Sequence, residues 1–193
     1  VYGLIAGGHP ALYDGSVPLC PSWGAFMTRW SGLLWHQNLR RGDPAMCTVS
    51  NDQVQWRELI QECVISRKRK FVVLHLVNPP PNDAIAKTEF SKPVGPFSVT
   101  FQPPKGAQVV AARLIDPSSM PFDRSLDVAI DPSFRYAATI PKLANWNMIV
   151  WELTGEFKVP PTSSKFSEPP DPVRVAAAMK GRVSTRTIDP NKG

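Results

Sequence analysis

Proline is the residue that most limits what this chain can fold into. The sequence holds 21 prolines in 193 residues, and they cluster at 79–81, 103–104, 160–161 and 169–172. Because proline fixes φ and lacks a backbone N–H, such clusters mark connections between helices and strands rather than their interiors. Apolar residues make up 42% of the chain and charged residues 20%, which leaves enough apolar material for a core. We therefore expect a folded chain of short elements separated by stiff turns.

Between residues 71 and 154 the apolar residues recur mainly with a period of two, which is typical of strands. This pattern predicts about seven short strands, at 71–77, 84–90, 97–102, 108–116, 125–130, 134–140 and 147–154. No helical segment separates them, so we expect a mostly β fold, an antiparallel β-sandwich rather than a parallel sheet. The residues expected in its core are Val73, Val99, Val109, Ala111, Val128 and Ile149.

The first 66 residues have a different pattern. A short apolar run at 2–6 predicts a strand that ends in a tight turn. Apolar residues at helical spacing predict a helix over 22–38, with Arg40 and Arg41 near its end. A second helix is expected over 51–65, because its start fits a capping box and one face would be apolar, through Trp56, Leu59, Ile60 and Cys63.

These patterns divide the chain into three parts, 1–66, 67–155 and 156–193. The run of basic residues at 67–70 is interpreted as a solvated turn. The last part is rich in proline and extended, and we expect it to lie across another domain or protomer. Its apolar anchors would be Phe157, Phe166, Val173, Val175 and Met179.

Charge and cysteine content argue against several classes of function. The net charge is +6, but the basic residues are spread along the chain, so we expect no nucleic-acid binding. No apolar run approaches the roughly 18 residues of a membrane span. Three cysteines fit no zinc spacing and are expected to be buried thiols, and we expect no metal and no cofactor. The chain begins abruptly in an apolar run, so we expect the natural polypeptide to start earlier.

Two segments carry a resemblance to a known family. Residues 72–80 (VVLHLVNPP) and 141–152 (PKLANWNMIVWE) resemble the strands that open and close the C-terminal β-domain of glycoside hydrolases such as the dextranase-like family 66. Residues 3–14 and the tryptophan-rich helix resemble the last turns of a (β/α)8 barrel. The resemblance implies the C-terminal portion of a carbohydrate-active enzyme, a glycoside hydrolase or glucanotransferase-like protein, with the sandwich as accessory domain. A polysaccharide enzyme of this kind would be extracellular or periplasmic.

Glycoside hydrolysis requires two carboxyl groups flanking the scissile bond, and barrels place them at the ends of several strands. This chain offers one such strand end, so the catalytic carboxylates are expected outside it. The candidate substrate-binding residues are His9, Tyr13, Asp14, Trp35 and His36. Each also has a structural interpretation, as a loop hydrogen bond, a turn or part of the core.

His75 stands in the middle of an apolar strand, with Leu74 and Leu76 on either side. Its ring should point to the face opposite theirs, and we interpret it as a core or edge histidine with satisfied hydrogen bonds rather than as a metal ligand. The alternative to an enzyme is a non-catalytic β-sandwich, an interaction or carbohydrate-binding module whose tail straps onto a partner subunit.

Overall fold

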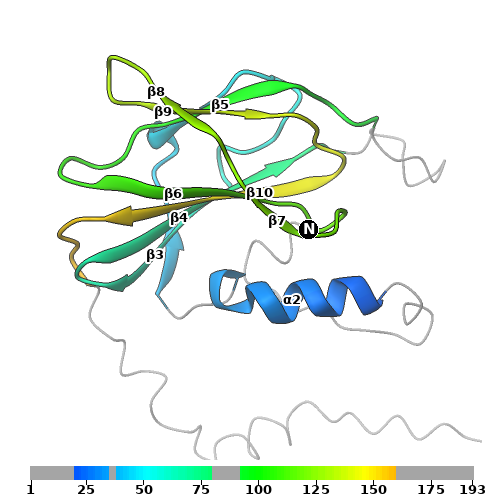
Figure 1. Ribbon diagram of the computed structural model, residues 1–193, viewed down its shortest axis with the longest axis horizontal. Coiled ribbons are helices and arrows are strands. Elements are labelled where there is room, and N and C mark those ends of the chain that lie inside the picture. The colour runs from blue at the N-terminus through cyan, green and yellow to red at the C-terminus, as the bar shows by residue number, and fades with distance from the viewer. Residues whose placement is uncertain (1–19, 35–37, 80–91, 160–193) are drawn as a thin grey trace, which may run out of the picture. The chain divides into compact units, whose positions relative to one another are not determined.

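The computed structural model describes residues 20–34, 38–79 and 92–159. Within these ranges the chain forms a six-stranded and a four-stranded sheet, which face each other, and one α-helix (Figure 1). Every pair of neighbouring strands is antiparallel. The prediction of a mostly β, antiparallel sandwich is therefore confirmed. The strands expected at 2–6 and 84–90 lie outside the described residues.

The six-stranded sheet has its strands in the order β1 (Leu39–Arg41), β3 (Ile60–Ser66), β4 (Arg69–Val77), β10 (Trp146–Thr154), β6 (Gln108–Ile115) and β7 (Asp123–Ser125). The order in the four-stranded sheet is β2 (Cys47–Val49), β5 (Phe97–Phe101), β9 (Tyr136–Ile140) and β8 (Val128–Ile130). A short 3-10 helix, η2 (Pro44–Met46), precedes β2. The five predicted strands at 71–77, 97–102, 108–116, 134–140 and 147–154 correspond to β4, β5, β6, β9 and β10. The segment 125–130 divides between β7 and β8.

The prediction of a helix over residues 51–65 is wrong. Residues 60–66 form β3, which pairs with β4 in a hairpin whose register matches Ile60 with Leu74. Apolar residues three and four apart fit a helix, but pairing with β4 and burial between two layers decide the outcome. The hairpin joins residues on both sides of position 66, and β1 and β2 also belong to the sheets.

The basic run at 67–70 is only partly a solvated turn. Its first two residues form the turn of the β3–β4 hairpin. Lys70, however, lies in β4 and is 7% exposed. Its ammonium group is 2.6 Å from a carboxylate oxygen of Glu62. The ion pair compensates for burying the charge.

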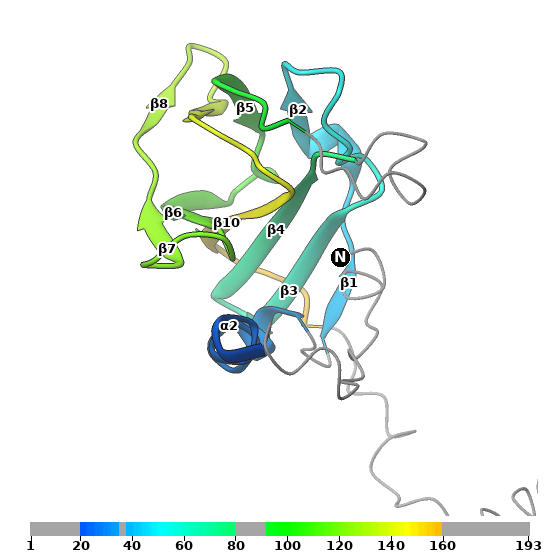
Figure 2. The same ribbon diagram turned by 90° about the vertical axis from the view of Figure 1, so that its right-hand side faces the viewer.

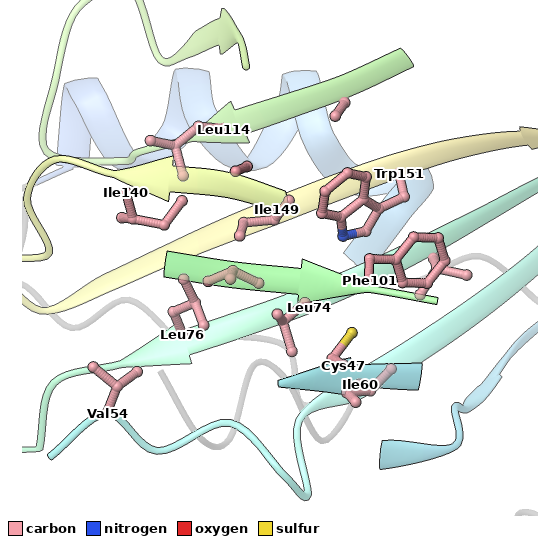
Figure 3. Close-up of a cluster of buried hydrophobic side chains, with 14 of the residues drawn as sticks. Cys47, Val54, Ile60, Leu74, Leu76, Phe101, Leu114, Ile140, Ile149 and Trp151 are labelled. Carbon is pink, nitrogen blue, oxygen red and sulfur yellow. The ribbon is translucent and has the colours of Figure 1, made fainter. Parts of the chain in front are cut away.

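The main core lies between the two sheets. The rings of Phe101 and Trp151 stack there with their centres 4.9 Å apart. Figure 3 shows both side chains in this cluster. Val99 and Ile149 are buried in this core as predicted. Val109 and Val128 are partly buried and pack against it.

Ala111 was predicted in the core but is only partly buried. The reason is a bulge in β6, where Glu152 pairs with Ala111 while the next residue, Leu153, pairs with Val109. Val110 is thus an extra residue, and it is 57% exposed. An extra residue reverses the alternation of faces. The core position therefore moves to Ala112.

A second core lies on the other face of the six-stranded sheet, where helix α2 (Cys20–Leu34) packs (Figures 1 and 2). Phe26 of the helix contacts Phe122 and Trp146 edge to face, with ring centres 5.6 Å apart in both pairs. Val73, the remaining predicted core residue, is buried here. The helix predicted over 22–38 is confirmed for residues 22–34, but the two arginines expected near its end, Arg40 and Arg41, lie in β1. Within the described residues no helix has the length and apolar character to span a bilayer.

Phe157 does not behave as the partner-binding anchor that the sequence predicted. Its backbone N–H donates to the carbonyl of Arg67 over 2.8 Å, and its ring packs against the main core. The side chain is therefore part of the chain's own sandwich. The other four expected anchors lie outside the described residues.

Candidate functional site

The His75–Asn78 segment at the end of β4 organises one end of the sandwich. His75 is fully buried. Its Nδ1 accepts a hydrogen bond from the indole N–H of Trp146 over 3.2 Å, and its Nε2 lies 2.9 Å from Oε1 of Gln61. Because Nδ1 is an acceptor, Nε2 carries the proton and donates to Gln61.

Burial lowers the pKa of His75 from 6.5 to about 3, because the charged ring would lose its hydration. The neutral, doubly hydrogen-bonded ring fits the predicted core histidine. The described residues hold no cluster of three potential metal-ligating side chains.

Asn78 connects four segments of the chain. Its side-chain amide donates to the carbonyls of Lys92 and Ala144, both over 2.9 Å. Its Oδ1 accepts from the side-chain amide of Gln53, also over 2.9 Å. Asn78 itself is only 2% exposed. Asn78 thus ties the end of β4 to the loop before β3 and to the segment before β10.

The loop between β2 and β3, residues 50–59, is held at several points. Asn51 Oδ1 accepts from the N–H of Gln53 over 2.9 Å, which makes a local turn. Gln55 pairs with Val77 through two backbone hydrogen bonds of 2.8 and 3.0 Å. Val54 and Leu59 are buried in the two cores, on opposite faces of the sheet. The loop is therefore fixed to the sandwich although it has no regular secondary structure.

This loop lines the candidate site, an open pocket of ≈ 500 Å³ that we call the Trp56 pocket. Trp56 packs against the main core with part of its side chain exposed, and the guanidinium carbon of Arg57 lies 5.4 Å from a ring centre of Trp56. Glu58 pairs with Arg41 of β1. The residues that line the pocket are Val49, Asn51, Asp52, Val54, Gln55, Trp56, Arg57, Glu58 and Leu59.

A second cavity, of ≈ 580 Å³, lies at the edge strand β8 of the four-stranded sheet. It has no aromatic residue among the residues that line it, which are Arg124, Ser125, Leu126, Asp127, Val128, Ala129, Ala137, Thr139 and Pro141. It therefore lacks the apolar, flat surface that Trp56 provides in the first cavity.

All of the substrate-binding residues predicted from the sequence lie outside the described residues, namely His9, Tyr13, Asp14, Trp35 and His36. Trp56 was instead assigned to the apolar face of a helix. The signal that could have identified the pocket is the crowding of polar residues around one tryptophan in SNDQVQWRE, residues 50–58. Such crowding is more typical of a loop than of a buried helix face.

No family model matches the chain, and no curated protein matches it either. Among solved structures it is similar to a Paenibacillus sp. cycloisomaltooligosaccharide glucanotransferase, crystallised with cycloisomaltoheptaose. The TM-score is 0.50 and the identity 14%, over 67% of this chain and 20% of that one. Another similar structure is α-L-fucosidase isoenzyme 2 from Paenibacillus thiaminolyticus, with a TM-score of 0.35 and 15% identity over 70% of this chain and 17% of that one.

The chain thus spans about a fifth of the glucanotransferase. At this identity the similarity defines a fold, a β-sandwich domain of the kind found in a carbohydrate-active enzyme.

Proposed function

We propose that this chain is the C-terminal portion of a carbohydrate-active enzyme, a glycoside hydrolase or glucanotransferase, in which the β-sandwich is an accessory domain. The observation that carries the proposal is the similarity of fold to a glucanotransferase over 67% of the chain. The chain spans a fifth of that enzyme, so the catalytic carboxylates would lie in a part of the polypeptide outside these residues.

The physical role of the sandwich would be support. The six-stranded sheet is covered on one face by the other sheet and on the other by α2, with an apolar cluster on each face. Such a doubly covered sheet is rigid, and a rigid neighbour can hold the loops of a catalytic domain in place.

The test is an activity assay on the polypeptide from the complete reading frame, with dextran and starch as substrates. We expect release or transfer of glucosyl units by that polypeptide and none by the 193-residue chain alone. In the complete polypeptide, the substitution Val99→Ala should shorten the half-life of activity on heating but leave the initial rate unchanged, because Val99 lies in the sandwich core. Turnover by the 193-residue chain would contradict the placement of the catalytic residues. A complete polypeptide that acts on neither polysaccharide would contradict the assignment itself.

The second candidate is a carbohydrate-binding or interaction module without catalysis. The Trp56 pocket favours it, because the pocket combines an aromatic ring with polar side chains.

Under both candidate functions, we propose that the segment 156–193 contacts another domain or protomer through residues that follow Phe157. Truncation after residue 159 should then reduce the sedimentation coefficient of any assembly and leave the circular dichroism of the sandwich unchanged. If the assembly is unaffected, the segment has no such role.

A further inference from the structure

We propose that the Trp56 pocket binds a neutral sugar ring. The inference rests on the proposed function for its ligand class, carbohydrate, and goes beyond it by assigning a binding site on the sandwich itself.

The pocket has the size and rigidity of a ligand site. Its volume of ≈ 500 Å³ falls within the range of about 300–1,000 Å³ that is common for small-molecule sites. Its wall is anchored by two buried side chains, Val54 and Leu59. The hydrogen bond from Gln53 to Asn78 adds a third anchor beside it. A wall that is already ordered loses little conformational entropy when a ligand binds.

The side chains in the pocket suit a sugar. Trp56 lines the pocket and is partly exposed, so the part of its ring that the main core and Arg57 leave open can pack against the C–H groups of a pyranose ring. Asp52 and Gln55 also line the pocket, and neither side chain makes a hydrogen bond to any of the described residues. A carboxylate accepts from hydroxyl groups, and an amide both donates and accepts. Together they match vicinal hydroxyls, each of which is a donor and an acceptor.

The charges around the pocket argue for an uncharged ligand. Asp52 and Glu58 carry negative charge, and Arg57 lies on Trp56 with positive charge. Arg41 pairs with Glu58 from the neighbouring β1. The positive and negative side chains around the pocket are therefore equal in number. A phosphate or a uronate would be repelled by Asp52, the carboxylate that Arg41 does not pair with, and would gain little from Arg57, which already lies over an aromatic ring.

The experiment measures binding by the 193-residue chain with isothermal titration calorimetry. The probes are isomaltose, maltose and cellobiose, and the charged comparators are glucose 6-phosphate and glucuronate. We expect at least one neutral disaccharide to bind with a Kd of about 1 mM, a value usual for a small polar ligand in an open site.

Four variants locate the binding. Asp52→Asn should weaken it about tenfold, because the amide oxygen still accepts from a sugar hydroxyl but the hydrogen bond is no longer charge-assisted. Trp56→Ala should abolish measurable binding and Trp56→Phe should retain part of it, because a smaller ring remains. The matched control is Asp127→Asn in the second cavity, which should bind as the unaltered chain does. Circular dichroism monitors the folding of each variant. If Trp56→Ala does not fold, the binding affinities of Asp52→Asn and Trp56→Phe test whether the sugar binds in the Trp56 pocket.

Three outcomes would overturn the proposal: no binding of any neutral disaccharide, unchanged binding by both Asp52→Asn and Trp56→Phe, or tighter binding of a charged comparator. None of these three outcomes decides whether the proposed function is correct. If the complete polypeptide acts on a glucan while the pocket binds no sugar, the enzyme assignment holds and only the pocket assignment fails.

Discussion

The indole N–H of Trp146 donates to Nδ1 of His75 across 3.2 Å, and the two rings lie nearly parallel, with an interplanar angle of 15°. The bond joins β10 to β4 on the face that α2 covers. We predict that Trp146→Phe lowers the free energy of unfolding by about 1–3 kcal/mol beyond the loss of ring volume, because a buried acceptor loses its donor. Chemical denaturation measures this change.

Trp151→Phe is the matched control. The indole N–H of Trp151 is buried and has no hydrogen-bond partner among the described residues. The same substitution there removes ring volume but no hydrogen bond, so it should cost less. If Trp146→Phe costs no more than Trp151→Phe, the bond to His75 adds nothing to stability.

The pKa of His75 predicts a loss of stability in mild acid. The folded-state pKa is lowered from 6.5 to about 3, so between these values the unfolded chain binds a proton that the folded chain excludes. Stability is therefore complete above pH 6.5 and falls as the pH drops toward 3. Between pH 7.5 and pH 5 this residue alone should remove about 2 kcal/mol from the free energy of unfolding.

The comparison variant for this effect is His75→Gln, which can still accept from Trp146 and donate to Gln61 but does not titrate. The free energy of unfolding of both proteins should be measured by urea denaturation at the two pH values. The unaltered chain should lose about 2 kcal/mol more than the variant. Parallel pH profiles would show that His75 is not excluded from protonation in the folded state.

Asn78→Asp tests the connection between the loops at the end of β4. The carboxylate keeps the shape of the side chain and can still accept from Gln53, but it cannot donate to the carbonyls of Lys92 and Ala144. We expect a loss of about 2–4 kcal/mol in unfolding free energy, since the two carbonyls lose their donor and a charge is placed at a position that is only 2% exposed.

The control for this substitution is Asn145→Asp, at an exposed position nearby, where a change within about 0.5 kcal/mol is expected. Thermal unfolding followed by circular dichroism compares the two variants. Equal transition temperatures would mean that the three bonds of Asn78 do not hold the loops.

Phe134 offers a stabilising substitution. It has a φ of 58° in the turn between β8 and β9, and it is 75% exposed. A left-handed backbone costs a bulky residue about 1 kcal/mol, whereas asparagine tolerates it. Phe134→Asn should therefore raise the free energy of unfolding by about 0.5–1 kcal/mol. Ser133→Asn, one position earlier in the same turn, is the control and should change it little. A destabilised Phe134→Asn protein would mean that the ring makes contacts that outweigh the strain.

The sequence by itself determined the class of fold and most of its strands. Alternation with a period of two, interrupted by proline-rich turns, is a local pattern, and it predicted β4, β5, β6, β9 and β10. It also predicted that His75 is a structural histidine in the core or at an edge, on the face opposite its two leucine neighbours, and the structure places it in the core. These properties depend on residues close together in the chain.

The tertiary structure alone decided the rest. Whether residues 60–66 form a helix or a strand depended on their pairing with β4, since their apolar spacing suits both. The bulge at Val110 exchanged Ala111 for Ala112 in the core, because one extra residue reverses every later face of the strand. The bonds of Asn78 reach 14 and 66 residues along the chain. The loop of the Trp56 pocket is likewise held by bonds from Gln55 to Val77 and from Gln53 to Asn78. The local sequence pattern can indicate a loop there, but it carries no information about contacts of that length.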